Sequence, residues 1–245
     1  MAVNKYQKQY LVRSYECDKH QNLRLLTLMN ILQDSADSSA DILGVGYDYC
    51  VAHNLAWVAA NYHVKILRAP KIHENITIHT WPSEEKKLGA IRDYALFDAE
   101  GKLLVQASTQ WVLINFVTKR PQSLRDNLPF YDILPEKADN YEFTKLLPPE
   151  RFDYEKIYAV RFDDIDVNNH VNNAVYPLWM SEAVTTDFRD SHTVAELEIA
   201  FKKPAVAGEK VIIKTALNGE QTYHQIFAEN DGRELARGQI KWMSV

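Results

Sequence analysis

The sequence predicts an α+β protein made of two tandem copies of one module, each an antiparallel sheet wrapped around a single long helix. Two observations support this prediction. The chain of 245 residues resembles itself at three separate places that occur in the same order. Each half also carries one segment with helical apolar spacing, followed by about four segments that alternate between apolar and polar residues.

The internal repeat is the stronger of the two observations. The paired blocks are residues 12–18 with 160–166, residues 64–80 with 199–215, and residues 101–111 with 232–242. The spacing between equivalent residues shrinks along the chain, which indicates longer connections in the first copy. Three blocks in one order predict a tandem duplication.

The elements of each copy follow in the same order. A short strand is expected at Gln7–Arg13 and at Lys156–Phe162, each leading into a polar loop. A helix follows the loop, because apolar residues recur there at spacings of three and four. These residues are Leu25, Leu28, Met29 and Leu32 in the first copy, and Val175, Leu178, Trp179 and Ala183 in the second. Alternating strands come next, with hairpin turns at Gly101 and at Gly232, so the sheet should be antiparallel.

Composition sets the domain boundaries and limits the function. Residues 118–150 are rich in proline and charge and are predicted to link a first module at 1–117 to a second at 151–245. A net charge of −5 argues against nucleic-acid binding, and the apolar runs are too short to cross a membrane. The two cysteines and the polar start favour a reducing, cytoplasmic location without a metal clip.

A polar loop before the second helix carries the candidate chemistry. It brings Asp166, Asn168 and His170 close to the start of the helix, where Asn172 or Asn173 is predicted to be the N-cap. Helix N-termini present free N–H groups and a dipole that favours negative charge. Hydrolysis of a thioester needs an oxyanion stabiliser and a group that activates water, and this loop offers both.

The loop sequence Asp-x-Asn-x-His-Val-Asn-Asn-x-x-Tyr resembles the signature of hotdog-fold acyl thioesterases. With the two copies, the chain is similar to the fatty acyl-acyl carrier protein (acyl-ACP) thioesterases of plants and bacteria. The similarity extends to Leu55–Val58, Arg92–Tyr94 and Gln110–Val112. It implies a double hotdog fold, hydrolysis of fatty acyl-ACP thioesters, and no cofactor or metal.

The resemblance also implies roles for residues. Asp166, Asn168 and His170 are the expected catalytic residues. Loop or substrate-binding roles are expected for Asn172, Asn173, Tyr176 and Trp57. The family's further carboxylate, often followed by cysteine, falls here on Pro204 and Ala205, which leaves the fourth catalytic residue open. Two substitutes are Glu182, predicted on the inward face of the helix, and Glu198.

The first copy is predicted to lack catalysis. It keeps Asp18, but His20 and Asn22 stand in the positions of Asn168 and His170, so the two residue types are exchanged. The resemblance implies that the interior of this copy holds the acyl chain.

Several alternatives stay open at this stage. Water activated by His170 and direct attack by a carboxylate are both compatible with the loop. The chain could instead cleave coenzyme A thioesters, or bind acyl groups without catalysis. An acidic carrier protein would need a local basic patch, and the candidates are Lys86-Lys87, Lys119-Arg120 with Arg125, and Lys202-Lys203. A homodimer is compatible with a tandem chain.

Overall fold

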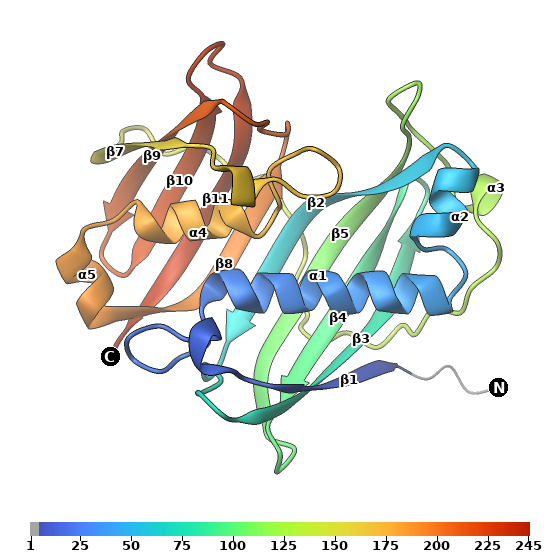
Figure 1. Cartoon of the computed structure of the whole chain (residues 1–245), viewed down its shortest axis with the longest axis horizontal. Coiled ribbons are helices and arrows are strands. Elements are labelled where there is room, and N and C mark those ends of the chain that lie inside the picture. Colours follow the sequence, from blue (N-terminus) through green and yellow to red (C-terminus); the bar gives the residue numbers. More distant parts are fainter. Residues whose placement is uncertain (1–4) are drawn as a thin grey trace. The chain divides into compact units, whose positions relative to one another are not determined.

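The structure is a computed structural model that describes residues 5–245. The chain divides into two compact units, Met1–Tyr141 and Glu142–Val245. Each unit is an antiparallel sheet with a helix across one face (Figure 1). The boundary between the units falls inside the segment that was predicted to be a linker, residues 118–150.

Unit 1 contains the longer of the two central helices. Its strands follow the order β1-β3-β4-β5-β2, and every neighbouring pair is antiparallel. The strands are β1 (Tyr6–Leu11), β2 (Leu55–Ile66), β3 (Asn75–Lys86), β4 (Gly89–Phe97), β5 (Leu103–Asn115) and the short β6 (Arg120–Pro121), which pairs with β5. The helices are α1 (Leu25–Ile42), α2 (Tyr47–Ala52) and α3 (Leu124–Asn127), and a 3-10 turn spans Ser14–Glu16.

Unit 2 repeats this arrangement with shorter elements. Its strand order is β7-β9-β10-β11-β8, again antiparallel throughout. This is the order of unit 1 with each strand replaced by its equivalent. The strands are β7 (Tyr154–Ala159), β8 (His192–Phe201), β9 (Lys210–Asn218), β10 (Gln221–Ala228) and β11 (Glu234–Ser244). The helices are α4 (Val175–Glu182) and α5 (Thr186–Ser191), and a 3-10 turn spans Phe162–Asp164. The predicted duplication and the four strands after each helix are confirmed.

The central helices bury the predicted apolar stripe. In α1, Leu28, Met29 and Leu32 are buried, and the stripe continues toward the end of the helix as two buried serines, Ser35 and Ser39. In α4, Val175 and Trp179 are buried. Leu25 and Leu178 are half-buried, because each lies at the edge of its stripe.

Hydrogen bonds between neutral groups connect polar side chains in the core of unit 2. The imidazole of His224 lies 2.9 Å from Thr215 Oγ1 through Nδ1 and 2.8 Å from Thr222 Oγ1 through Nε2. Trp242 Nε1 donates to the same Thr222 oxygen at 2.9 Å. All four side chains are buried, and burial lowers the pKa of His224 to about 3, so the imidazole is neutral at physiological pH.

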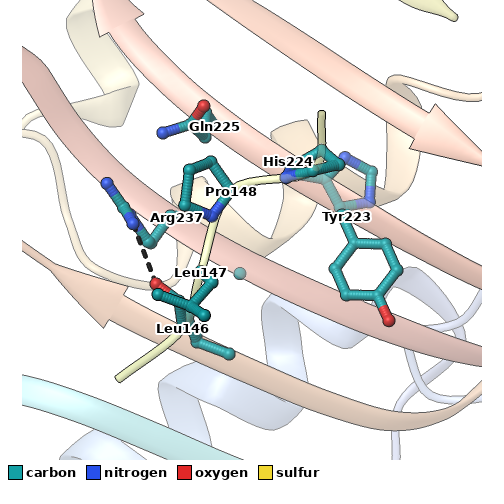
Figure 2. Close-up of a pocket in the computed structure, with 9 residues that line it drawn as sticks. Leu146, Leu147, Pro148, Tyr223, His224, Gln225 and Arg237 are labelled. Carbon is teal, nitrogen blue, oxygen red and sulfur yellow. Dashed lines mark hydrogen bonds between the residues drawn. The ribbon is translucent and has the colours of Figure 1, made fainter. Parts of the chain in front are cut away.

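Irregular segments cover the other face of each sheet. In unit 1, Trp81 Nε1 donates to the carbonyl of Glu136 at 2.8 Å, and the rings of His63 and Tyr141 stack at 3.6 Å. In unit 2, Arg237 Nη1 donates to the carbonyl of Leu146 at 2.8 Å, and a small pocket lies beneath Leu146–Pro149 (Figure 2). None of residues 166–170 lines this pocket. No helix within residues 5–245 is long and apolar enough to span a membrane.

Candidate active site

The predicted catalytic residues lie in one tight turn between the second 3-10 turn and α4. The amide of Asp166 donates to the carbonyl of His170 at 2.8 Å and closes the turn. Inside it, the Asp166 carboxylate accepts from the amide of Asn168 at 2.8 Å, and the amide of Asn169 donates to the Asp166 carbonyl at 3.0 Å. Asn169 has a φ of +59°, a left-handed conformation that asparagine tolerates better than most residues.

Three hydrogen bonds fix this turn to the rest of unit 2. Val171 donates to the carbonyl of Ala205 at 2.9 Å, and Asn172 donates to the carbonyl of Asp164 at 2.8 Å. The amide of Ala205 in turn donates to Tyr176 Oη at 2.9 Å. Tyr176 is buried, and burial raises its pKa to about 12, so the phenol stays protonated. Tyr176 therefore serves the turn as an anchor.

A residue that the sequence interpretation missed also holds the turn. This residue is Asp164, which is buried and accepts hydrogen bonds from Arg161. Arg161 Nη2 donates to Asp164 Oδ1 at 2.6 Å, and the Arg161 amide donates to Oδ2 at 2.9 Å. The sequence contained a signal for this role, because Arg13 and Glu16 stand at the equivalent positions of the first copy. There the amide of Arg13 donates to the Glu16 carboxylate at 2.8 Å.

The side chains that could perform chemistry face outward from the turn. Asn168 and His170 are exposed, and Asp166 is half-buried. Two apolar side chains beside them are almost fully exposed, Phe162 at 92% and Val167 at 90%. An exposed imidazole on a turn that the backbone holds fixed can reach both water and a substrate.

The predicted helix cap is wrong. The N-cap of α4 is Ala174, with no side-chain cap; Asn172 instead lies before the helix, where its Oδ1 accepts from the amide of Ala174 at 2.8 Å. The amide of Val175 donates to the Asn172 carbonyl, and Pro177 has no N–H. Only the amide of Tyr176 is left in the first turn, so the oxyanion donors expected at this helix end are few.

The two substitute carboxylates occupy different environments. The predicted inward position of Glu182 is wrong: its side chain is exposed, because α4 ends there and Trp179 and Met180 fill the inward face. Glu198 is 5% exposed on β8 and accepts from Gln239 Nε2 at 2.7 Å. Among residues 5–245, neither carboxylate hydrogen bonds to the turn.

The other predicted residues are placed as follows. Asn173 is half-buried directly before α4. Trp57 is half-buried on β2 of unit 1, where its Nε1 donates to the carbonyl of Val45 at 2.9 Å. Ala205, at the family's carboxylate position, is fully buried beside the turn and uses both backbone polar groups to hold it. This position therefore anchors the turn and offers no acid.

The equivalent turn in unit 1 shares most of these hydrogen bonds and has one more to its aspartate carboxylate. Asp18 Oδ1 accepts from the amides of His20 and Asn22 at 2.9 Å each, and the amide of Asp18 donates to the Asn22 carbonyl at 2.8 Å. Gln21 has a φ of +63°, matching Asn169. The backbone of the turn is conserved between the copies, while two of its side chains are exchanged.

Comparison with known proteins assigns both units. Residues 3–130 match the acyl-ACP thioesterase N-terminal domain, and residues 149–244 match the acyl-ACP thioesterase C-terminal domain. A palmitoyl-acyl carrier protein thioesterase of Gossypium hirsutum is 29% identical over 97% of this chain, and an oleoyl-acyl carrier protein thioesterase of Arabidopsis thaliana is 26% identical over 97%. The chain spans 63% of the first relative and 75% of the second.

Solved structures agree on the fold. A 12:0-ACP thioesterase from Umbellularia californica superposes with a TM-score of 0.86 at 23% identity, covering 100% of this chain and 99% of that one. An acyl-ACP thioesterase from Bacteroides thetaiotaomicron gives 0.81 at 19% identity and 97% coverage of both chains. The predicted α+β double hotdog is confirmed. On the match of both its halves to the paired domain families, this chain belongs to the acyl-ACP thioesterase family.

Proposed function

We propose that this protein hydrolyses fatty acyl-ACP thioesters to a free fatty acid and the carrier protein with its free thiol. The observation that carries the proposal is the turn of unit 2, which presents Asn168 and His170 to solvent on a backbone fixed by Asp166 and Ala205. Membership in the family and the names of the relatives support the same reaction.

His170 is the proposed general base. Imidazole is the side-chain group that most often serves as a general base near neutral pH. The imidazole takes a proton from water as the water oxygen bonds to the thioester carbonyl carbon. The C–S bond then breaks, and the imidazolium returns the proton to the departing thiolate. Asn168 is proposed to orient the base or the carbonyl.

Asp166 has a positioning role in this proposal. One of its carboxylate oxygens accepts from the amide of Asn168 and so holds the turn. Direct attack by this carboxylate is the alternative mechanism. We propose attack by water, because the exposed imidazole of His170 can act as its general base.

The carrier protein is the proposed partner, and the basic pair Lys202-Lys203 is the proposed docking site. Of the candidate basic residues, Lys86 pairs with Glu84 at 3.8 Å, Arg125 pairs with Glu85 at 3.3 Å and Lys202 pairs with Glu234 at 3.9 Å, so the proposal rests on Lys203. Lys203 is exposed and lies two residues from Ala205, which holds the catalytic turn. A cytoplasmic location and a homodimer stay predictions.

Hydrolysis of matched substrates tests the reaction. Wild-type protein and His170→Ala are assayed with acyl-ACP and acyl-CoA of equal chain length. We expect turnover of acyl-ACP by wild type and a loss of about 100- to 10,000-fold in kcat/KM for the variant. Preference for acyl-CoA would move the assignment to coenzyme A thioesters. Lack of turnover of either substrate would favour an acyl-binding protein, and equal rates for the two proteins would reject His170.

Charge reversal tests the docking site. Lys203→Glu should raise KM for acyl-ACP without changing KM for acyl-CoA, because only the carrier protein is acidic over a large surface. Lys87→Glu makes the same charge change in unit 1 and serves as the comparison. A rise in KM with Lys87→Glu alone would move the docking site to unit 1.

A further inference from the structure

A buried arginine inside unit 1 lacks an acidic partner. Arg92 on β4 is 8% exposed, and its Nη1 donates to Ser39 Oγ at 2.9 Å and to Thr80 Oγ1 at 3.3 Å. Within residues 5–245 it forms no ion pair with a carboxylate. The ionisable groups that act on it are the phenols of Tyr62, Tyr94 and Tyr131. Burying a cation without a counter-charge is costly, and here burial lowers the pKa of the guanidinium.

A second buried polar group without a full set of hydrogen bonds lies on α1, and it is the hydroxyl of Ser35. Ser35 is 1% exposed, and its hydroxyl has no hydrogen-bond partner. Ser35 and Ser39 are four residues apart on α1, so both side chains lie on one face of the helix. Ser39 is already bonded to Arg92. Arg92 on β4 is thus bonded to one of two buried serines that share a face of α1, and the other serine has no partner.

The remainder of this helix face is apolar. Leu28, Met29 and Leu32 precede the serines along the same buried stripe of α1. A ligand that complements this interior would combine an apolar chain with a negatively charged oxygen group. A guanidinium fits a carboxylate, because its planar donors can bond both carboxylate oxygens.

The second copy shows that the hotdog module does not require this charge. Thr80 lies opposite Tyr94 in unit 1, and the equivalent Thr215 lies opposite His224 in unit 2. Two residues before His224, where unit 1 has Arg92, unit 2 has Thr222. Thr222 bonds to neutral neighbours that are also bonded. The arginine is therefore a feature of unit 1 alone.

We propose that Arg92, with Ser35 and Ser39, binds the carboxylate of a ligand that carries an apolar chain. Two sources share this chemistry: a free fatty acid, and an acyl group whose far end bears a second carboxylate. The first source is independent of hydrolysis. The second rests on the proposed function, because the other end of such a ligand would be the thioester.

Direct binding to the full chain tests the proposal without any hydrolysis. Dodecanoate, dodecanol and the monomethyl ester of dodecanedioic acid are titrated by calorimetry into wild type and Arg92→Met. At least one of the two carboxylates should bind wild type and lose about 10- to 100-fold in affinity in the variant, as expected for losing a hydrogen bond to a charged group. Dodecanol should not distinguish the two proteins. Arg24→Met removes an exposed charge from the same unit and should bind as wild type does.

Ser35→Ala keeps the proposal testable if Arg92→Met does not fold. The Ser35 hydroxyl has no partner, so its removal should leave the fold intact while weakening carboxylate binding about three- to tenfold. Equal affinity of both carboxylates for wild type and the variants, or failure of both to bind wild type, would overturn the proposal. Binding at Arg92 in a protein that cleaves no thioester would keep this site and reject only the proposed function.

Discussion

Residues 16–24 of unit 1 and residues 164–172 of unit 2 form the same turn with different side chains. In both, the aspartate carboxylate accepts from the amide two residues further along, and a residue with a positive φ follows. At the end of each turn an amide donates to a carbonyl of a neighbouring loop, that of Pro70 in unit 1 and of Ala205 in unit 2. Counted from the aspartate, the imidazole is at the third position of the turn in unit 1 (His20) and at the fifth position in unit 2 (His170). The backbone thus explains the shape of the turn, and only the side chains distinguish the copy proposed to be catalytic from the copy predicted to lack catalysis.

The interiors differ in a complementary way. The core of unit 2 contains a neutral network in which His224 and Trp242 are hydrogen bonded. The interior of unit 1 contains a cation and an unpartnered hydroxyl, at Arg92 and Ser35. These buried polar groups of unit 2 are thus hydrogen bonded to one another, whereas those of unit 1 include a hydroxyl without a partner, at the site proposed to bind a carboxylate. Four predictions test this contrast between the copies.

Matched aspartate substitutions should separate the two turns by activity. Asp166→Ala and Asp18→Ala each remove a carboxylate that holds backbone amides, so each should cost about 1 kcal/mol in the free energy of unfolding. Only Asp166→Ala should also lower kcat/KM, by about 100- to 10,000-fold, because the loss displaces Asn168 and His170. Denaturant titrations and steady-state kinetics measure both effects. Similar kinetic losses in the two variants would show that both turns take part in catalysis.

The neutral core of unit 2 should make the protein sensitive to acid. The pKa of His224 is about 3 in the folded state and about 6.5 when unfolded, so the unfolded state binds more protons below pH 6.5. Its contribution to stability is complete above pH 6.5 and is lost as the pH falls toward 3, by about 1.4 kcal/mol per pH unit. In His224→Gln the slope between pH 6 and 4 should be smaller by that amount. Identical slopes would mean that His224 does not titrate as a buried neutral group.

The duplication and the fold are predictable from the sequence, because both depend on the spacing of apolar residues and on turn residues, which can be seen in short stretches of sequence. The turn from Asp166 to His170 was recognised by its residue types. The role of Ala205 was not, because a backbone anchor leaves no mark on residue identity. The position of Glu182 was missed because α4 ends earlier than the apolar spacing indicated. Arg92 was noted only as part of a resemblance, since its isolation from carboxylates exists only in three dimensions.

A change of side-chain size where α4 packs on β11 should cost more stability than a change at the equivalent position of β5 in unit 1. A Cβ on Gly238 would lie 2.5 Å from the carbonyl oxygen of Glu198 and 2.6 Å from Met180 Cε. Gly238→Ala should therefore cost about 1–3 kcal/mol in the free energy of unfolding. The equivalent residue in unit 1 is the buried Ala107, and Ala107→Gly should cost about 1 kcal/mol through backbone entropy. A neutral Gly238→Ala in thermal unfolding would show that the helix can shift away from the sheet.

The smallest expected effect concerns the last residue of each turn, Arg24 in unit 1 and Asn172 in unit 2. Asn172 and Arg24 are equivalent, but only Asn172 accepts an amide through its side chain, from Ala174 at 2.8 Å. Asn172→Ala should cost about 1 kcal/mol in the free energy of unfolding, because that amide loses its partner. Arg24→Ala should change it by less than about 0.5 kcal/mol, as for most exposed positions. If both variants lost the same stability in denaturant titration, the side chain of Asn172 would not be what orders the start of α4, and the backbone bonds shared by both turns would suffice.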